Sequence, residues 1–307
     1  MIEKFLNILI LFFFPFLFIG IINRVKAFWG GRKGQPIFQS FFDFVKLLKK
    51  GQVISKNSSL IFQITPTIYL VTVILAGLIV PMVNYQNIFS FDGDFLIFAY
   101  ILAFGRFFMI LSAMDTSSSF SGMGASREAT YSALIEPVFL VILSSIGFLS
   151  DQISFKGILT TLQQNNIISV LLISLCVVAF SIIMITECKR VPVDDPNTHL
   201  ELTMIHEVMI LDNSGPDLGF ILYGSYIKLI VLSSIIANLI LPANLAFWIA
   251  LCLFLLILIL IAVAIGCIES IFARLRLIRV PQFILLITSI AILVLSIIQF
   301  SIFGGLK

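Results

Sequence analysis

The sequence predicts an all-α integral membrane protein with eight transmembrane helices, an interfacial amphipathic helix and a folded acidic loop. Of its 307 residues, 60% are hydrophobic and 11% are charged, whereas a soluble domain carries about 25% charged residues. So few charges cannot cover the apolar surface of a soluble fold, and the same composition excludes a disordered chain. The net charge of +3 is too small to hold the phosphates of a nucleic acid. We therefore expect a lipid-embedded protein with no nucleic-acid partner.

Eight apolar stretches are long enough to cross a bilayer as helices. A span requires about 18 or more predominantly apolar residues, and each stretch meets this length with few charges. No soluble domain is expected at either end, so residues 1–307 are predicted to form a single membrane domain. The predicted spans are Phe5–Asn23, Phe62–Val83, Phe95–Met114, Arg127–Leu149, Ile167–Thr186, Phe220–Leu241, Ala243–Cys267 and Val280–Phe303.

The basic residues predict the orientation of these spans. Fourteen of the 19 lysines and arginines lie in the alternate loops 24–61, 115–127, 187–219 and 268–279. The opposite side has Lys4, Lys156 and Lys307. Because cytoplasmic loops carry an excess of Lys and Arg, we expect both termini outside, in the cell membrane of a prokaryote.

Residues 35–50 predict a helix of a different kind. Phe38, Phe41, Phe42, Val45 and Leu48 recur at helical spacing, and polar residues occupy the opposite side. This pattern is typical of an amphipathic helix in the membrane interface, with its lysines toward the headgroups. A surface anchor without a specific role is the alternative.

Three charged residues stand out deep inside the predicted spans. Arg106, Glu136 and Lys228 each fall roughly 12–14 Å from the basic side, at a rise of 1.5 Å per residue. A shared depth predicts a buried cluster in which both cations hold the Glu136 carboxylate, with Glu128 about two turns away. Ionisable residues inside a membrane are costly and usually functional. The alternative is that they only lock helices together.

The segment 187–219 is rich in acids and is predicted to be a folded, half-buried loop. Seven of the chain's 16 acids lie there, interleaved with apolar residues. No metal site is expected, since His206 and Glu207 are not followed by the second His of a zinc motif. The four cysteines form no C-x-x-C pair, so no iron–sulfur cluster is expected either.

Two motifs of the sequence resemble those of a known family. The first is Gly122-Met-Gly-Ala-Ser-Arg-Glu128 followed by Ala133-Leu-Ile-Glu136-Pro137. The second runs from Glu187 through Arg190, Pro192, Asp194 and Pro196 to His206-Glu207. With the basic turn 30–34 and eight spans, they resemble the membrane subunit of energy-converting [NiFe] hydrogenases of the formate hydrogenlyase kind. This subunit belongs to the superfamily of NADH dehydrogenase subunit 1, the quinone-site membrane subunit of complex I.

Three departures favour the hydrogenase branch over complex I. Gly34 runs almost directly into the amphipathic helix, without the Asn-Arg-x-Gly-Pro extension of the complex I relatives. Asn197 and His199 stand where the quinone-site pattern has acids. A quinone-site subunit of a complex I-type NADH:quinone oxidoreductase is nevertheless the alternative.

The resemblance implies a subunit of an oxidoreductase complex with no redox cofactor or active site of its own. The [NiFe] and Fe–S centres are then expected in hydrogenase large and small subunits on the cytoplasmic side, and antiporter-like subunits in the membrane. Proton or ion coupling is assigned to Arg106, Glu128, Glu136 and Lys228. The expected interface with the soluble arm comprises Glu187, Arg190, Asp194, Asp195, His199, Glu201, His206 and Glu207.

Overall fold

The computed structural model describes residues 2–55, 58–83, 87–150, 152–161, 167–195, 204–242 and 245–303. This part of the chain forms α-helices joined by loops, with one short 3-10 helix and no strand. The elements are α1 (Ile2–Trp29), α2 (Gln39–Leu48), α3 (Leu60–Ile79), α4 (Asp94–Asp115), α5 (Ser119–Ser150), α6 (Phe155–Thr161), α7 (Ile167–Glu187), α8 (His206–Met209), α9 (Pro216–Ile240), α10 (Phe247–Ile271), η1 (Leu277–Arg279) and α11 (Val280–Phe303).

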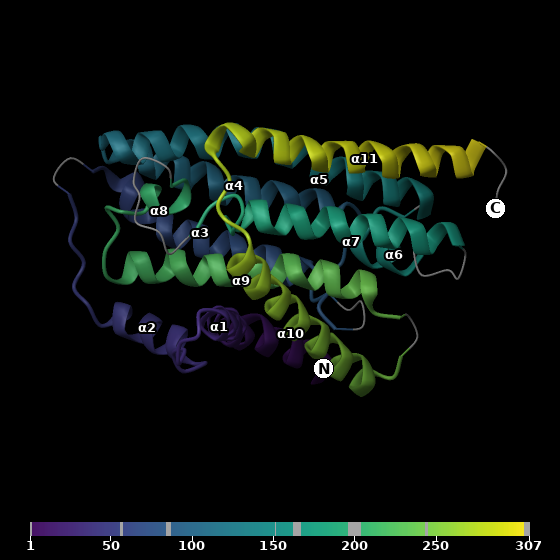
Figure 1. Ribbon diagram of the computed structural model, residues 1–307, viewed down its shortest axis with the longest axis horizontal. Helices are drawn as coiled ribbons and strands as arrows, with labels where there is room; N and C mark the ends of the chain where they lie inside the picture. Colours follow the sequence, from purple (N-terminus) through teal and green to yellow (C-terminus); the bar gives the residue numbers. More distant parts are fainter. Residues whose placement is uncertain are drawn as a thin grey trace.

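Eight of these helices are long and apolar enough to cross a membrane, which confirms the predicted fold class. They are α1, α3, α4, α5, α7, α9, α10 and α11. Most run side by side along the long axis of the molecule, and α10 crosses them obliquely (Figure 1). We call the end that carries α2 and α8 the loop face, at the left of Figure 1; α6 lies at the other end. The helix α2 falls within the stretch predicted to be amphipathic.

The helix α9 forms the centre of the bundle, and its buried residues include polar side chains among many branched apolar ones. Ser233, Ser234 and Asn238 are fully buried. The Asn238 amide donates to the Pro81 carbonyl at 2.6 Å and to the Ser234 carbonyl at 3.0 Å. Side chains of this kind let membrane helices approach closely and join them by hydrogen bonds.

The helix α5 begins earlier than predicted. Residues 115–127 were expected to be a loop between two spans, but the chain is helical from Ser119. A methyl group added at Gly124 would lie 2.9 Å from the Ile205 carbonyl oxygen and from the Met209 side chain. Close packing against the segment leading into α8 therefore outweighs the low helix propensity of glycine.

Other boundaries also differ from the prediction. The helix α10 begins and ends four residues later than expected, so it includes Glu269. The short helix α6 was not predicted. The short helix α8, His206–Met209, lies within the segment predicted to be an acidic loop.

Candidate functional site

The chain that follows α7 stays inside the bundle. Glu187 is the last residue of α7, and Glu187, Lys189, Arg190 and Asp194 are all buried. Lys189 adopts the left-handed backbone conformation with φ of 52°, which turns the chain sharply at the end of the helix. The first part of the acidic loop is thus more deeply buried than the predicted half-buried loop.

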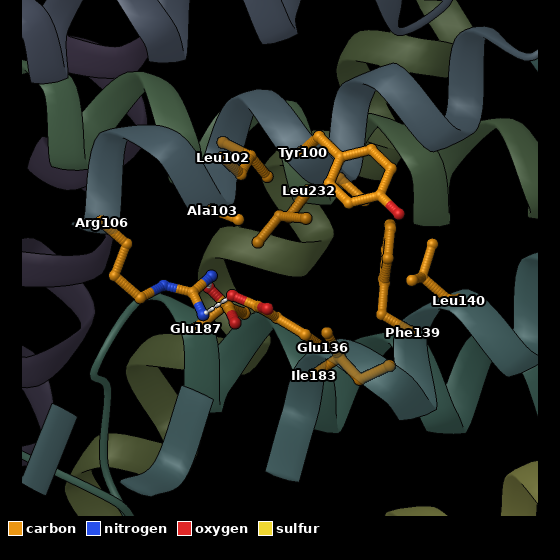
Figure 2. Close-up of a pocket in the computed structure, with 11 residues that line it drawn as sticks. Tyr100, Leu102, Ala103, Arg106, Glu136, Phe139, Leu140, Ile183, Glu187 and Leu232 are labelled. Carbon is orange, nitrogen blue, oxygen red and sulfur yellow. Dashed lines mark hydrogen bonds and ion pairs between the residues drawn. The ribbon is translucent and has the colours of Figure 1, made fainter. Parts of the chain in front are cut away.

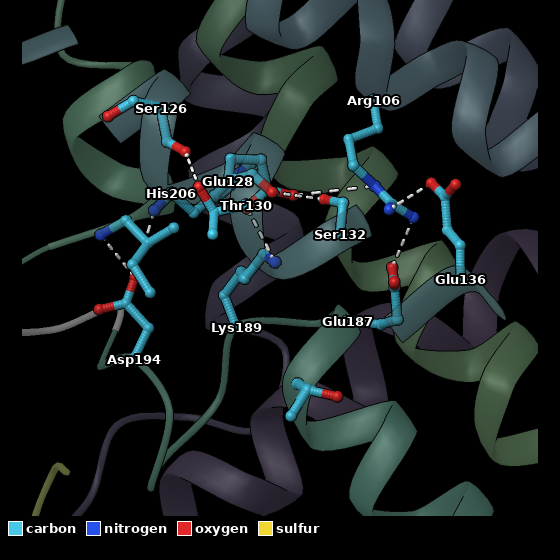
Figure 3. A network of polar contacts seen from close by, with 12 residues as sticks. Arg106, Ser126, Glu128, Thr130, Ser132, Glu136, Glu187, Lys189, Asp194 and His206 are labelled. Carbon is cyan, nitrogen blue, oxygen red and sulfur yellow. Dashed lines mark hydrogen bonds and ion pairs between the residues drawn. The ribbon is translucent and has the colours of Figure 1, made fainter. Parts of the chain in front are cut away.

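The Arg106 guanidinium on α4 is the centre of a network of charges (Figure 3). Nη1 lies 2.6 Å from Oε1 of Glu136, and Nη2 lies 3.0 Å from Oε2 of Glu187. Nε lies 3.8 Å from Oε1 of Glu128. One cation therefore faces three carboxylates, two on α5 and one at the end of α7.

Two lysines complete this network. The Lys228 ammonium on α9 lies 2.7 Å from Oε2 of Glu187 and donates to the Glu187 main-chain carbonyl at 3.1 Å. The Lys189 ammonium lies 2.8 Å from Oε2 of Glu128. Three cations and three carboxylates balance, so the network is formally neutral. We call these six residues the charge network: Arg106, Glu128, Glu136, Glu187, Lys189 and Lys228.

The structure changes the expected arrangement of the intramembrane charges. Arg106, Glu136 and Lys228 do lie near one another, but the carboxylate between the two cations is Glu187. Glu136 pairs with Arg106 at the margin of the network, where its side chain is 40% exposed. The prediction that both cations hold Glu136 was therefore wrong, because α7 extends by one residue and brings Glu187 inward.

Two other loop residues fix the segment to its neighbours. Arg190 lies 3.2 Å from Glu269, which also binds Lys26 at 2.8 Å. Asp194 lies 2.9 Å from Arg274. Its second carboxylate oxygen accepts hydrogen bonds from the amides of Ile205 and His206. These contacts tie the loop to α1, α10 and the start of α8, outside the charge network.

The structure describes some of the remaining predicted loop residues and not others. Asp195 is partly buried beside Asp194. His199 and Glu201 lie outside the described residues. Sequence analysis did not select Lys189 or Glu269; the signal for Glu269 was an acid directly after a long apolar run, next to a predicted span.

His206 and Glu207 at the start of α8 lie in an environment that alters their titration. Burial and the nearby Asp194 carboxylate raise the pKa of Glu207 to about 7. Burial lowers the pKa of His206, which favours the neutral imidazole. Its Nε2 atom is buried and has no hydrogen-bond partner among the described residues. A carboxyl group with a pKa near the ambient pH is suited to exchange protons.

Three small cavities follow one another through this region. The first has a volume of about 150 Å³ and is lined by His206, Glu207 and Asp194. The second, of about 30 Å³, shares Cys188, Lys189, His206 and Ser225 with it. Cavities of this size hold one to several waters when polar groups line them.

The third cavity extends away from the charge network between α4 and α5 (Figure 2). Its volume is about 50 Å³, and it shares Arg106 and Glu187 with the second cavity. Glu136 lies at its polar end, whereas Tyr100, Phe139 and Leu140 make the rest apolar. Because neighbouring cavities share lining residues, the three cavities form a series from Glu207 at the loop face to Glu136 at the flank of the bundle.

A comparison with protein families shows which family the chain belongs to. Residues 3–300 match the family described as NADH dehydrogenase. The chain belongs to this family. Within the NADH dehydrogenase family it is 30% identical over 227 residues to Hydrogenase-4 component C of Escherichia coli K12, covering 74% of this chain and 70% of the relative. It is 26% identical over 283 residues to Formate hydrogenlyase subunit 4 of the same organism, covering 89% and 91%.

A solved structure shares the fold of this NADH dehydrogenase family member. It is a chain of the membrane-bound sulfane sulfur reductase, an archaeal respiratory membrane complex, with a TM-score of 0.80 and 20% identity. The match covers 97% of this chain and 98% of that one. The two chains therefore share their fold over nearly their full lengths.

Proposed function

We propose that this chain is the membrane subunit of a hydrogenase complex of the formate hydrogenlyase kind and couples its chemistry to ion movement. The names of the two relatives support the hydrogenase branch over a quinone-site subunit of complex I. The chain then acts as one subunit of an oxidoreductase, with [NiFe] and Fe–S centres held by large and small subunits at the loop face. We assign the loop face to the cytoplasm and both termini to the outside.

The series of cavities between Glu207 and Glu136 is the observation that supports coupling through this chain. A proton taken up at the loop face reaches His206 and Glu207 first. The charge network lies next. Because the network is formally neutral and most of it is buried, one added proton strongly changes the electric field around it in this low-dielectric environment. Arg106 is in contact with Glu128, Glu136 and Glu187. It therefore transmits that change to the flank between α4 and α5.

The exposure of Glu136 supports an antiporter-like partner at this flank. A carboxylate that is 40% exposed on an apolar membrane surface is costly when it faces lipid. A neighbouring membrane subunit with a polar or cationic group removes this cost. We therefore assign the cavity between α4 and α5 to the contact with an ion-moving subunit.

The substitution Glu136→Gln tests this function in the intact complex. We expect hydrogen evolution with an artificial electron donor to persist and hydrogen-linked acidification of inverted vesicles to be lost. Asp92→Asn, which removes an exposed carboxylate near the start of α4 at the other end, is the matched control and keeps both activities. Unchanged acidification in the Glu136→Gln complex would refute the coupling role. Inhibition of the wild-type complex by quinone-site ligands would instead favour the complex I alternative.

A further inference from the structure

A groove at the loop face, remote from the charge network, combines three cations with apolar walls. It has a volume of about 500 Å³ and lies between the end of α1 and the last third of α10. Arg24, Arg32 and Lys33 provide its basic part. Its apolar part consists of Val25, Phe28, Trp29, Val263 and Cys267.

The local fold brings the three cations together. Gly31 has a φ of +62° and turns the chain back after α1. The Arg32 amide donates to the Ala27 carbonyl at 2.9 Å. A methyl group added at Gly34 would lie 2.7 Å from the Ala27 side chain, so the returning chain rests directly on α1. Arg32 and Lys33 are thereby held beside Arg24.

The apolar wall results from a close contact between α1 and α10. A methyl group added at Gly266 would lie 2.8 Å from Cβ of Val25. The two helices therefore approach closely at this level and leave a shallow furrow beside the contact. Phe28 is 82% exposed and Trp29 is 56% exposed at its edge. Exposed aromatic rings at the end of a membrane helix are typical of the headgroup level.

The cations of this groove lack acidic partners. Within the described part of the chain, none of the three takes part in an ion pair. Lys26, two residues after Arg24, is instead paired with the buried Glu269. The groove therefore carries three positive charges without an acidic partner in the residues that the structure describes, whereas the charge of Lys26 is neutralised by Glu269.

We propose that this groove binds one anionic phospholipid from the leaflet at the loop face. Arg24, Arg32 and Lys33 hold the phosphate, since guanidinium groups form paired hydrogen bonds to phosphate oxygens. An acyl chain lies against Val25, Phe28 and Val263. Basic pockets between membrane helices bind anionic headgroups in this way. The lipid fastens the end of α1 to α10 and orients the turn 30–34 toward the membrane.

Native mass spectrometry of the delipidated full chain in detergent tests the proposal. We expect phosphatidylglycerol to bind more tightly than phosphatidylcholine. The triple variant Arg24→Gln, Arg32→Gln and Lys33→Gln should weaken phosphatidylglycerol binding by on the order of a hundredfold, at about one kcal/mol per basic residue. The matched control Lys46→Gln, Lys49→Gln and Lys50→Gln removes the same charge from α2 and the two residues that follow it, and should retain the preference. Equal losses in both triple variants would overturn the proposal, because general surface charge would then explain the binding.

Two further measurements separate a lipid from other occupants. Val263→Phe narrows the apolar half without a change of charge and should weaken lipid binding, whereas Leu260→Phe, one turn away on the exposed side, should not. A large excess of inorganic phosphate should leave the lipid bound, because phosphate has no acyl chain. Displacement by phosphate would show an anion site instead. In the intact complex, photoactivatable phosphatidylglycerol should label residues 24–34; cross-links from these residues to a neighbouring subunit, without lipid label, would also overturn the proposal.

Discussion

The helices α9 and α10 have the same length of 25 residues and very different surroundings. Of the spanning window of α9, 78% is buried, compared with 28% for α10, although α10 is the more apolar of the two. In this molecule, therefore, the most apolar helix faces outward, and the helix that holds Lys228, Ser233 and Asn238 lies at the centre. A high apolar content therefore indicates that a helix faces the lipid, and polar residues indicate that a helix lies in the interior of the bundle.

The largest effect is expected for Arg106→Leu, a substitution in the polar interior of the bundle. The substitution leaves the buried Glu187 and the partly exposed Glu136 without their guanidinium partner, and breaking a buried pair costs about 3–5 kcal/mol. We expect a loss of this size in the free energy of unfolding, measured by denaturant titration of the purified chain in mixed micelles. Arg106→Lys should recover part of it, since lysine retains the charge but not the fork. A change below about 1 kcal/mol would show that the network behaves as a surface cluster.

Asn238→Leu probes the polar interior of α9 without a charge. The variant loses the donor to the Pro81 carbonyl and forces a branched apolar group into a fully buried position. We expect a loss of roughly 2–3 kcal/mol in the same measurement. Ile240→Ala, at an exposed position two residues along the same helix, is the control. A loss in the control equal to that of Asn238→Leu would mean that α9 has no distinct interior face.

Glu207 gives a pH dependence whose sign follows from its pKa. The folded pKa of about 7 lies above the ordinary value of 4.5 for a glutamate carboxyl, so its contribution to stability is complete below pH 4.5 and is lost as pH rises through 7. We expect the stability of the wild type relative to Glu207→Gln to fall by on the order of 1–2 kcal/mol between pH 5 and pH 8. His206 titrates in both proteins and cancels in the difference. Parallel stability curves for the two proteins would contradict the assignment.

The smallest effect is expected on the outward side of α10. Leu260 is exposed, and Leu260→Ala exchanges one lipid contact for another. Its effect should stay within about 0.5 kcal/mol. Ala262→Leu, at a fully buried position on the same helix, is the comparison and should cost about 1–3 kcal/mol through overpacking. Similar values for the two variants would remove the distinction between the faces of α10.

Much of the fold could be predicted from the sequence because the bilayer imposes a minimum length on apolar segments. All eight spans and the amphipathic α2 lie where the pattern indicates. The boundaries were less accurate where packing decides them, as at Ser119, where a stretch rich in Gly and Ser is helical against the segment around Ile205.

The candidate site was predicted in composition more accurately than in pairing. The charges of Arg106, Glu136 and Lys228 stand out because they interrupt apolar runs. The sequence does not reveal that α7 ends inside the bundle, so Glu187 was assigned to the cytoplasmic loop and Lys189 was not selected as a site residue. Pairing depends on where a chain turns in space, and the turn at Lys189 has no local sequence signal. The coupling role of these residues stays a prediction.

The position of Lys228 has a consequence for membrane insertion. Its ammonium binds both the carboxylate and the main-chain carbonyl of Glu187, so it also satisfies the C-terminal end of α7. A nascent chain that ends before Pro216 contains three carboxylates of the charge network against two cations. The insertion of α9 supplies Lys228 as the third cation, so the network becomes formally neutral only when this helix has joined α4, α5 and α7.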